Sequence, residues 1–213
     1  VVLAVMTGFA TDITSKILGA NAHIRVMSRG GTVDRYEEVM KKIRAVAGVE
    51  ATAPYVYCQV MLRHGAFVSG AVLRGIDPNR AGQVLDLEKS IDKTALQALA
   101  GDESAAEQDQ GDEALPGMVL GKELARLLVA FPGDEVRVIS PYGGTLTPFG
   151  GRVPHMKRFK VVGLFDSGMY DYDTSFAYVS LESAPRLLRL GDAVHAVEVR
   201  VDDIYGVDVI AKS

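Results

Sequence analysis

The stretch from Val49 to Val68 constrains the fold of this chain more than any other. β-branched and aromatic residues dominate it, and such side chains favour extended strands over helices. We therefore predict one long strand or two shorter ones here, with Pro54 near the start of the first. The rest of the chain has to supply the elements that pack against these strands.

Shorter strands and helices are predicted on both sides of this stretch. Alternating or β-branched segments predict strands, and apolar residues spaced three to four apart predict helices. Predicted strands cover 22–27, 71–76, 117–120, 134–139, 158–165, 175–179 and 194–201, and predicted helices cover 11–18, 34–46, 91–99, 122–129 and 181–190. The opening order of strand, helix, strand, strand predicts an α+β fold rather than repeated βαβ units.

Length and composition are typical of a globular protein and name no activity. The 213 residues fit one large domain or two small ones, and 48% apolar residues exclude disorder along the whole chain. A net charge of −4 argues against a nucleic-acid partner and against binding to an anionic membrane surface. Six acids and no base lie in segment 101–113, which predicts a solvated loop, and the rest would carry +2.

The first residues are unusually apolar. No charge precedes Asp12, yet the eleven residues before it are too few to cross a bilayer, which takes about 20. Two interpretations stay open from this feature alone. Residues 1–11 are either the last turns of a longer membrane helix or part of a buried N-terminal helix.

Two short motifs resemble catalytic sites but lack necessary parts. Gly117 to Lys122 resembles a phosphate-binding loop, but it is one residue short and is followed by Glu123 instead of Ser or Thr. We interpret it as a strand-to-helix turn. Asp171 and Asp173 resemble a phosphatase nucleophile pair, but Asp166 holds the strand-tip position which that chemistry needs, so we predict turn residues.

The histidines and the cysteine do not indicate a metal site or a catalytic nucleophile. The single cysteine, Cys58, lies in an apolar strand and has no partner for a disulfide within the chain. None of the histidines has another ligand at metal-binding spacing; they are His23, His64, His155 and His195. We predict no catalytic residue, no metal site and no cofactor.

Segment 141–157 has the composition of a binding loop. It holds four glycines, three prolines and no acid, and Pro148 and Pro154 exclude a regular helix. The strands on either side predict a hairpin with this segment as a long tip. The segment combines apolar and cationic side chains, which is typical of a surface that binds a partner; a solvated loop is the alternative. The apolar side chains are Leu146, Phe149, Val153 and Met156, and the cations are Arg152, Lys157 and the adjoining Arg158.

Short matches along nearly the whole chain resemble the periplasmic domain of the LolC and LolE family. They occur in family order, and only the acidic segment is left unmatched. The matching segments are Met6–Phe9, Ile17–Gly19, Leu73–Pro78, Gly133–Val138, Thr147–Gly150, Arg152–Pro154, Phe159–Phe165 and Gly168–Asp173. LolC and LolE are membrane subunits of the lipoprotein-releasing ABC transporter, whose periplasmic domains are similar to that of the exporter MacB.

The resemblance implies a fold and a domain division. Residues 1–18 would be the periplasmic end of a first membrane helix. A porter-like part would comprise 19–76 and 132–213, and it would carry a protruding hairpin hook at 141–158. A second part would be inserted at 77–131, including the acidic loop. ATP hydrolysis would belong to a separate subunit, and the domain would lie in the periplasm of a Gram-negative bacterium.

The resemblance also implies a partner and the residues that bind it. In LolC-like members the hook recruits LolA, a soluble periplasmic carrier that receives the released lipoprotein. Arg137 matches a carrier-contacting arginine at the hook base, Pro148 the proline at the tip, and Lys157 a basic residue on the return side. The further partner-binding residues are Phe149, Arg152, Val153, Pro154 and Met156, of which Met156 replaces a polar residue of the family.

Two other interpretations remain. The chain is also compatible with an extracytoplasmic domain of another MacB-like or FtsX-like subunit, which would handle a different substrate or partner. A standalone phosphatase that uses Asp171 or Asp173 is the second, and it would need magnesium. Binding to a LolA-like carrier would favour the hook hypothesis over the first of these interpretations. Magnesium-dependent phosphatase turnover would support the second.

Overall fold

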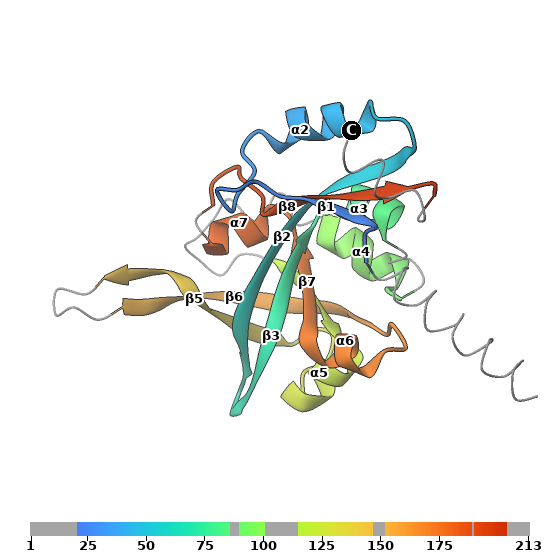
Figure 1. The fold of residues 1–213 in the computed structure, drawn as a ribbon. Coiled ribbons are helices and arrows are strands. Elements are labelled where there is room, and N and C mark those ends of the chain that lie inside the picture. The colour runs from blue at the N-terminus through green and yellow to red at the C-terminus, as the bar shows by residue number, and fades with distance from the viewer. Residues whose placement is uncertain (1–20, 86–89, 101–114, 147–151, 189, 204–213) are drawn as a thin grey trace, which may run out of the picture.

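The computed structural model describes residues 21–85, 90–100, 115–146, 152–188 and 190–203 (Figure 1). Strands and helices are mixed along these ranges, which confirms the α+β class. The strands are β1 (Ile24–Val26), β2 (Val49–His64), β3 (Phe67–Ile76), β4 (Gly117–Gly121), β5 (Glu135–Leu146), β6 (Arg152–Phe165), β7 (Phe176–Ser180) and β8 (Ala196–Val201). The helices are α2 (Tyr36–Arg44), α3 (Pro78–Val84), α4 (Lys93–Ala100), α5 (Lys122–Leu128), α6 (Tyr170–Ser175) and α7 (Ser183–Leu188).

The β-rich stretch becomes a long strand and the start of a second one. β2 runs for 16 residues, and β3 returns beside it in an antiparallel hairpin from His64↔Phe67 to Tyr55↔Ile76. Gly65 has a φ of 56° in the turn between them, a left-handed conformation that glycine adopts without steric strain. The length of β2 allows it to pair with two further strands.

Six of the strands form a closed ring. The sheet order is β1-β8-β2-β3-β7-β4-β6-β5, and β5 also pairs with β2 through Met61↔Ile139 and Arg63↔Arg137. The N-terminal half of β2 pairs instead with β8, from Val49 to Tyr55. β2 is therefore shared between the ring and a short extension made of β8 and β1.

The main hydrophobic core fills the ring. Alternate residues of β2 point inward and are buried, and the other ring strands add side chains such as Met118 and Phe159. α5 and α7 contribute Leu124 and Leu187 to the same cluster. Cys58 is part of this core, and burial raises the pKa of its thiol, which keeps it protonated at neutral pH.

Two smaller cores lie outside the ring. α3 and α4 pack on the outer surface, where Ala81, Val84 and Leu99 bury Tyr178 and Phe165. Met40 of α2 packs against Val197 and Val199 of β8.

The sequence predicted only the end of a strand at Asp77 and Pro78, but a helix begins there. A carboxylate oxygen of Asp77 accepts a hydrogen bond from the Asn79 amide at 3.0 Å, and Pro78 occupies the first turn of α3. The acceptor and the proline are a helix-start signal that could have been recognised from the sequence.

Residues from the predicted inserted part enter the ring. β4 lies between β7 and β6, parallel to β6 and antiparallel to β7, and its five residues are all buried. α3 and α4 lie on the outside of the same sheet. The division into a porter-like part and an insertion at 77–131 stays a prediction. Within the described ranges, no helix is long and apolar enough to cross a membrane.

A buried ion-pair network joins the β1–β8 extension to the ring. One guanidinium nitrogen of Arg74 (β3) lies 2.7 Å from both carboxylate oxygens of Glu198 (β8), and Arg25 (β1) donates to the same carboxylate at 3.2 Å. Arg74 and Glu198 are 1% and 2% exposed. The ring of Tyr55 lies 4.7 Å from the Arg74 guanidinium carbon and 5.0 Å from that of Arg25. Arg74 belongs to the Leu73–Pro78 motif, so this motif has a structural role.

Candidate partner-binding hairpin

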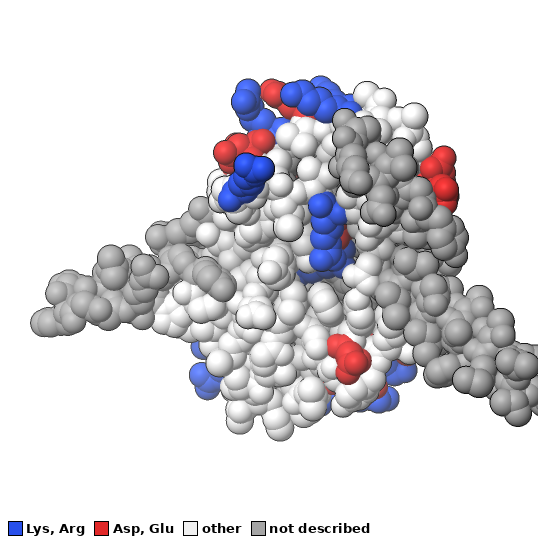
Figure 2. Space-filling view, in the orientation of Figure 1, with Lys and Arg blue, Asp and Glu red and all other residues white. Residues whose placement is uncertain are grey.

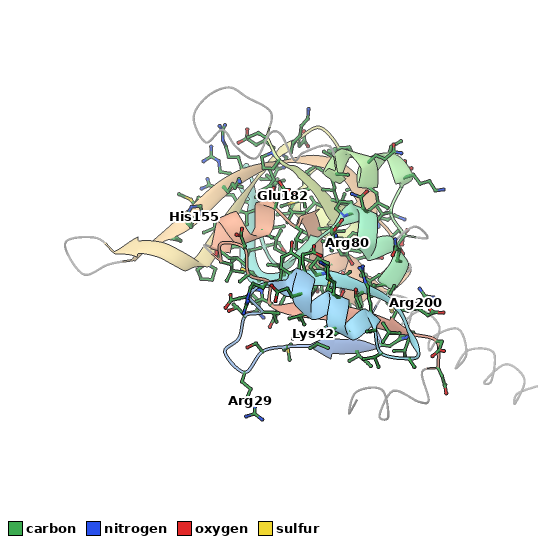
Figure 3. All side chains as sticks on the ribbon, turned by 90° about the horizontal axis from the view of Figure 1, so that it is seen from above. Arg29, Lys42, Arg80, His155, Glu182 and Arg200 are labelled. Atoms are coloured by element: carbon green, nitrogen blue, oxygen red, sulfur yellow. The ribbon has the colours of Figure 1, made fainter. Side chains whose placement is uncertain are left out.

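The predicted tip is a hairpin that leaves the body of the protein. β5 and β6 pair regularly as far as Ser140↔His155, the register then shifts, and pairing resumes at Thr145↔Val153 and Leu146↔Arg152. Figure 1 shows this end of β5 and β6 projecting from the rest of the fold. His155 lies where the hairpin leaves the body (Figure 3). The hairpin prediction is confirmed, and its strands reach further into segment 141–157 than expected.

The structure places six of the eight predicted partner-binding residues along the strands of this hairpin. Pro148 and Phe149 lie outside the described residues. Arg152 and Val153 form the first pairs of β6 after the tip. Pro154 and Met156 follow as exposed residues, Lys157 is partly buried, and Arg137 is exposed on β5.

Arg137 and Lys157 lie on opposite faces of the hairpin. Val138 is fully buried inside the ring, and its cross-strand partner is Lys157, so both point to the inner face. The Lys157 ammonium lies 5.8 Å from the centre of the buried Phe159 ring. Arg137 points outward, because successive strand residues alternate between faces. A partner that contacts both cations therefore has to meet the hairpin from two sides.

The outer face carries a row of arginines that was not predicted from the sequence. Arg63 of β2 is opposite Arg137, and Arg137 is opposite Arg158 of β6. All three are exposed, and direct cross-strand partners share a face. No local motif reveals the row, because Arg63 lies far from the hairpin in the sequence and joins it only through the β2–β5 register.

An apolar row follows the arginines on the same face. Met61 is opposite Ile139, which is opposite Met156. Met61 is 48% exposed and Met156 is 58% exposed, although both are large apolar side chains. Exposed apolar groups beside cations are typical of a protein-binding surface. The face over β2, β3 and β7 carries few charged side chains (Figure 2).

The motifs that resembled catalytic sites serve the fold. Gly117–Lys122 comprises the whole of β4 and the first residue of α5, so the chain passes here directly from strand to helix, as predicted. Lys122 donates to Asp166 at 2.7 Å, and this hydrogen bond, with one from the Gly168 amide, lowers the pKa of Asp166.

The prediction of turn residues at Asp171 and Asp173 is wrong, because both lie in the short helix α6. Asp173 is 4% exposed, and its Oδ1 accepts hydrogen bonds from the amide and hydroxyl of Ser167 at 2.9 and 2.8 Å. Asp171 lies on the exposed side of the same helix. Only one of the two carboxylates is therefore open to solvent.

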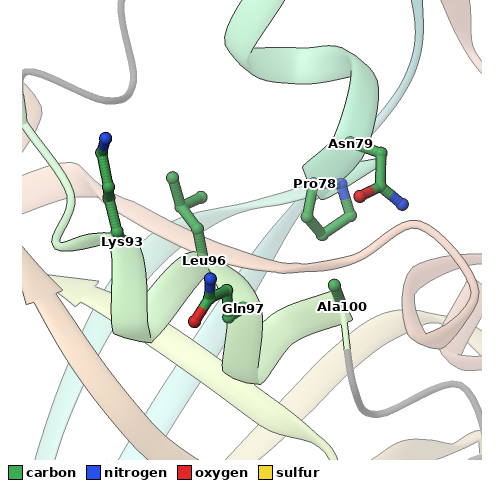
Figure 4. Close-up of a pocket in the computed structure, with 6 residues that line it drawn as sticks. All are labelled: Pro78, Asn79, Lys93, Leu96, Gln97 and Ala100. Carbon is green, nitrogen blue, oxygen red and sulfur yellow. The ribbon is translucent and has the colours of Figure 1, made fainter.

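A shallow pocket between α3 and α4 offers little chemistry. Lys93 is the only charged residue that lines it, and the rest of its wall is apolar or amide-bearing (Figure 4). The lining residues are Pro78, Asn79, Lys93, Leu96, Gln97 and Ala100. Nothing in this set resembles a catalytic or metal-binding group among the described residues.

Comparison with a family model identifies the fold. The model of the MacB-like periplasmic core domain matches residues 1–211. The chain belongs to this family. Among solved structures, the MacB-like chain is similar to the periplasmic region of MacB from Actinobacillus actinomycetemcomitans, with a TM-score of 0.53 and 13% identity over 92% of this chain and 83% of that one.

A second structural relative has the same fold. The extracellular domain of the noncanonic ABC-type transporter YknZ from Gram-positive bacteria matches with a TM-score of 0.52 and 14% identity, over 87% of this chain and 86% of that one. At such identities the likeness concerns the fold alone, and it confirms the MacB-like architecture that the sequence resemblance implied.

Sequence relatives confirm the resemblance to LolC. The lipoprotein-releasing system transmembrane protein LolC of Neisseria meningitidis serogroup B (strain MC58) is 31% identical over 206 residues, 95% of this chain. LolC of Xylella fastidiosa (strain Temecula1) is 31% identical over 202 residues. The MacB-like domain spans 46% and 45% of these two relatives, so it corresponds to just under half of such a protein.

Proposed function

We propose that this domain recruits a soluble LolA-type carrier in the periplasm and that the projecting β5–β6 hairpin is its docking element. The parent protein would be a membrane subunit of a lipoprotein-releasing ABC transporter. It would act with a second membrane subunit and a separate ATPase subunit. The lipoprotein cargo would pass to the carrier when ATP-driven motion of the membrane helices reaches this domain.

The observation that carries this proposal is the hairpin itself. It projects beyond the ring, its base presents exposed cations and apolar side chains, and it coincides with the segment that resembles the LolC hook. The LolC relatives share 31% of the aligned residues over 95% of the chain, which supports the same role. Arg137 would contact carboxylates of the carrier, and Phe149 and Val153 would enter its apolar opening.

The test is titration calorimetry of this domain against the LolA-type carrier from the same organism. We expect measurable binding, which Arg137→Ala and Pro148→Gly should each weaken by about 10-fold or more. Arg137→Ala removes a charge-assisted contact, and Pro148→Gly makes the bound tip conformation entropically less favourable. Thermal melting of both variants should match that of the unchanged domain; Arg137 is exposed on β5, so its side chain adds nothing to the ring core.

No heat of binding with the unchanged domain would contradict the proposal. The alternative function, an extracytoplasmic domain of another MacB-like or FtsX-like subunit, would then predict binding to a different periplasmic protein. A large drop in melting temperature for either variant would instead show that the hairpin is packed structure.

A further inference from the structure

The outer face of β2, β3 and β7 is covered at one end and open along the rest. At the covered end, α3 and α4 pack over Ile76 and Tyr178. Farther along, direct pairing places Gln59 of β2 beside Val72 of β3, and Val72 beside Phe176 of β7. These three side chains are exposed or partly exposed, so no other described element seals this part of the sheet. We call it the open face.

Tyr57 lies where the open face meets the covered end. It is 47% exposed, but its ring stacks on that of Tyr55 and makes an edge contact with His195, with both ring centres 5.8 Å away. Its amide also donates a hydrogen bond to Nδ1 of His195 at 3.2 Å. Tyr57 therefore presents an ordered aromatic surface, which loses little conformational entropy when a partner binds. Tyrosine and arginine are enriched among the residues that dominate binding at protein interfaces.

Two charges of opposite sign border the open face at different ends. Arg25 lies beside Tyr55 with 40% of its side chain exposed, and its guanidinium carbon is 5.0 Å from the Tyr55 ring centre. Asp171 is exposed on α6, and the next residue, Tyr172, stacks on Phe176 with ring centres 5.1 Å apart. Figure 2 shows a cationic group and, over α6, an acidic group, with uncharged side chains between them.

The positive end of the open face is only half compensated by the described acids. Glu198 accepts hydrogen bonds from both Arg25 and Arg74, so one carboxylate serves two guanidinium groups. Arg74 is 1% exposed, which leaves Arg25 as the group that a partner can reach. A carboxylate from another molecule completes the pairing, and complementary charges of this kind fix the register of an interface.

We infer that the open face binds the same face of a second copy of this chain about a two-fold axis. A charge of each sign at separate ends of an uncharged face matches its own copy after a half-turn, as an isologous interface requires. Arg25 of one copy then meets Asp171 of the second copy, and the reverse contact forms at the same time. Val72 and Phe176 lie at the centre of the pair, where water is excluded. This pairing goes beyond the proposed function, which concerns the hairpin.

A membrane surface matches the open face less well than a second copy does. Membrane binding through charge typically uses a cluster of about four to eight Lys and Arg residues. The open face has Arg25 as its reachable cation, and an anionic lipid layer repels Asp171. Self-pairing uses both charges, whereas a membrane uses one and opposes the other.

The first test is sedimentation equilibrium of the unchanged chain from about 1 μM to about 1 mM. We expect a reversible dimer. Asp171→Lys should weaken it by about 10-fold or more, because the new cation faces Arg25 of the second copy. Tyr57→Ala should weaken it by a similar factor through lost aromatic contact. Glu182→Lys makes the same charge change at an exposed position directly before α7, and should alter the dissociation constant by less than about 2-fold.

The second test replaces Val72 with cysteine, close to the proposed axis, and oxidises the chain mildly with copper phenanthroline. Two Val72→Cys copies should form a covalent dimer, because a disulfide needs Cβ atoms only about 4 Å apart. Lys42→Cys is the control, since α2 packs on Val197 and Val199, on the opposite face of the extension from Glu198. Cys58 is buried and does not compete.

Two results would overturn the inference. One is an unchanged chain that stays monomeric at every concentration. The other is a dimer that Asp171→Lys and Tyr57→Ala leave intact and in which Val72→Cys crosslinks no faster than Lys42→Cys, because the contact then lies elsewhere. Calorimetry should give Asp171→Lys the carrier affinity of the unchanged domain, so failure of the dimer and failure of the carrier proposal are distinguishable.

Discussion

Replacing Glu198 with alanine is expected to lower the free energy of unfolding by about 3–5 kcal/mol. The change leaves the Arg74 guanidinium 1% exposed and without its anion, in a site where Nε already lacks a hydrogen-bond partner among the described residues. Burial disfavours the charged form of Arg74, yet Glu198, with Tyr178 and Tyr55, raises its pKa above the usual value. Without Glu198, the free-energy cost of burying the Arg74 charge is no longer offset. Urea unfolding followed by circular dichroism measures the effect.

A matched control separates burial from the loss of a charge. Glu50 and Arg200 form an exposed ion pair at 3.3 Å on the same sheet, and Glu50→Ala should change stability by about 1 kcal/mol or less. A double replacement, Arg74→Met with Glu198→Leu, should recover most of the loss because it removes both buried charges. Equal effects of Glu198→Ala and Glu50→Ala would refute the buried network.

The sequence predicted local elements well because their causes are local. Alternation and helical spacing depend on near neighbours, and so does the effect of proline and glycine at the hairpin tip. The network of Arg74 and Glu198 could not be predicted in this way, since the two residues are 124 positions apart. A buried arginine inside an apolar strand was the available signal, and it names no partner.

Only the part of the candidate site that depends on neighbouring residues in the sequence could be predicted. Composition and flanking strands located the hairpin and its cations, and the family resemblance selected Arg137 and Lys157. The faces of these residues depend on the β5–β6 register, which pairs Val138 with Lys157 and thereby separates the two cations. The contribution of Arg63 depends on closure of the ring between β2 and β5, and strand pairing across such a distance has no sequence signature.

The β1–β8 extension contains the strands nearest the two ends of the described chain, whereas the ring strands lie between them in the sequence. β1 and β8 are the first and last strands of the described chain, and they pair with each other. Arg25 of β1 and Glu198 of β8 both join the network that reaches Arg74 in the ring. Under the proposed function, movement of membrane segments at either end of the domain would reach the hairpin through this junction. Under that proposal, the rigidity of the junction would matter for coupling as well as for stability.

Shortening the hairpin is expected to abolish carrier binding while the fold is kept. Ser140↔His155 is the last pair before the register shift, so residues 141–154 are replaced by Asn-Gly, which favours a two-residue turn. The deleted part includes Pro148, Phe149 and Val153, whose contacts the proposal needs. Affinity measured by calorimetry should fall by about 100-fold or more, the loss expected when several central contacts disappear together.

Folding of the shortened domain follows from where its core lies. The residues that fill the ring from β5 and β6 are Val136, Val138, Phe159 and Val161, and all lie outside the deletion. The melting temperature should therefore stay within a few degrees of the unchanged domain. A matched deletion within the acidic segment 101–113 removes a similar length of chain and should leave affinity unchanged. If the shortened domain stays folded and still binds the carrier at full strength, docking occurs elsewhere on the domain and the hairpin is not the recruiting element.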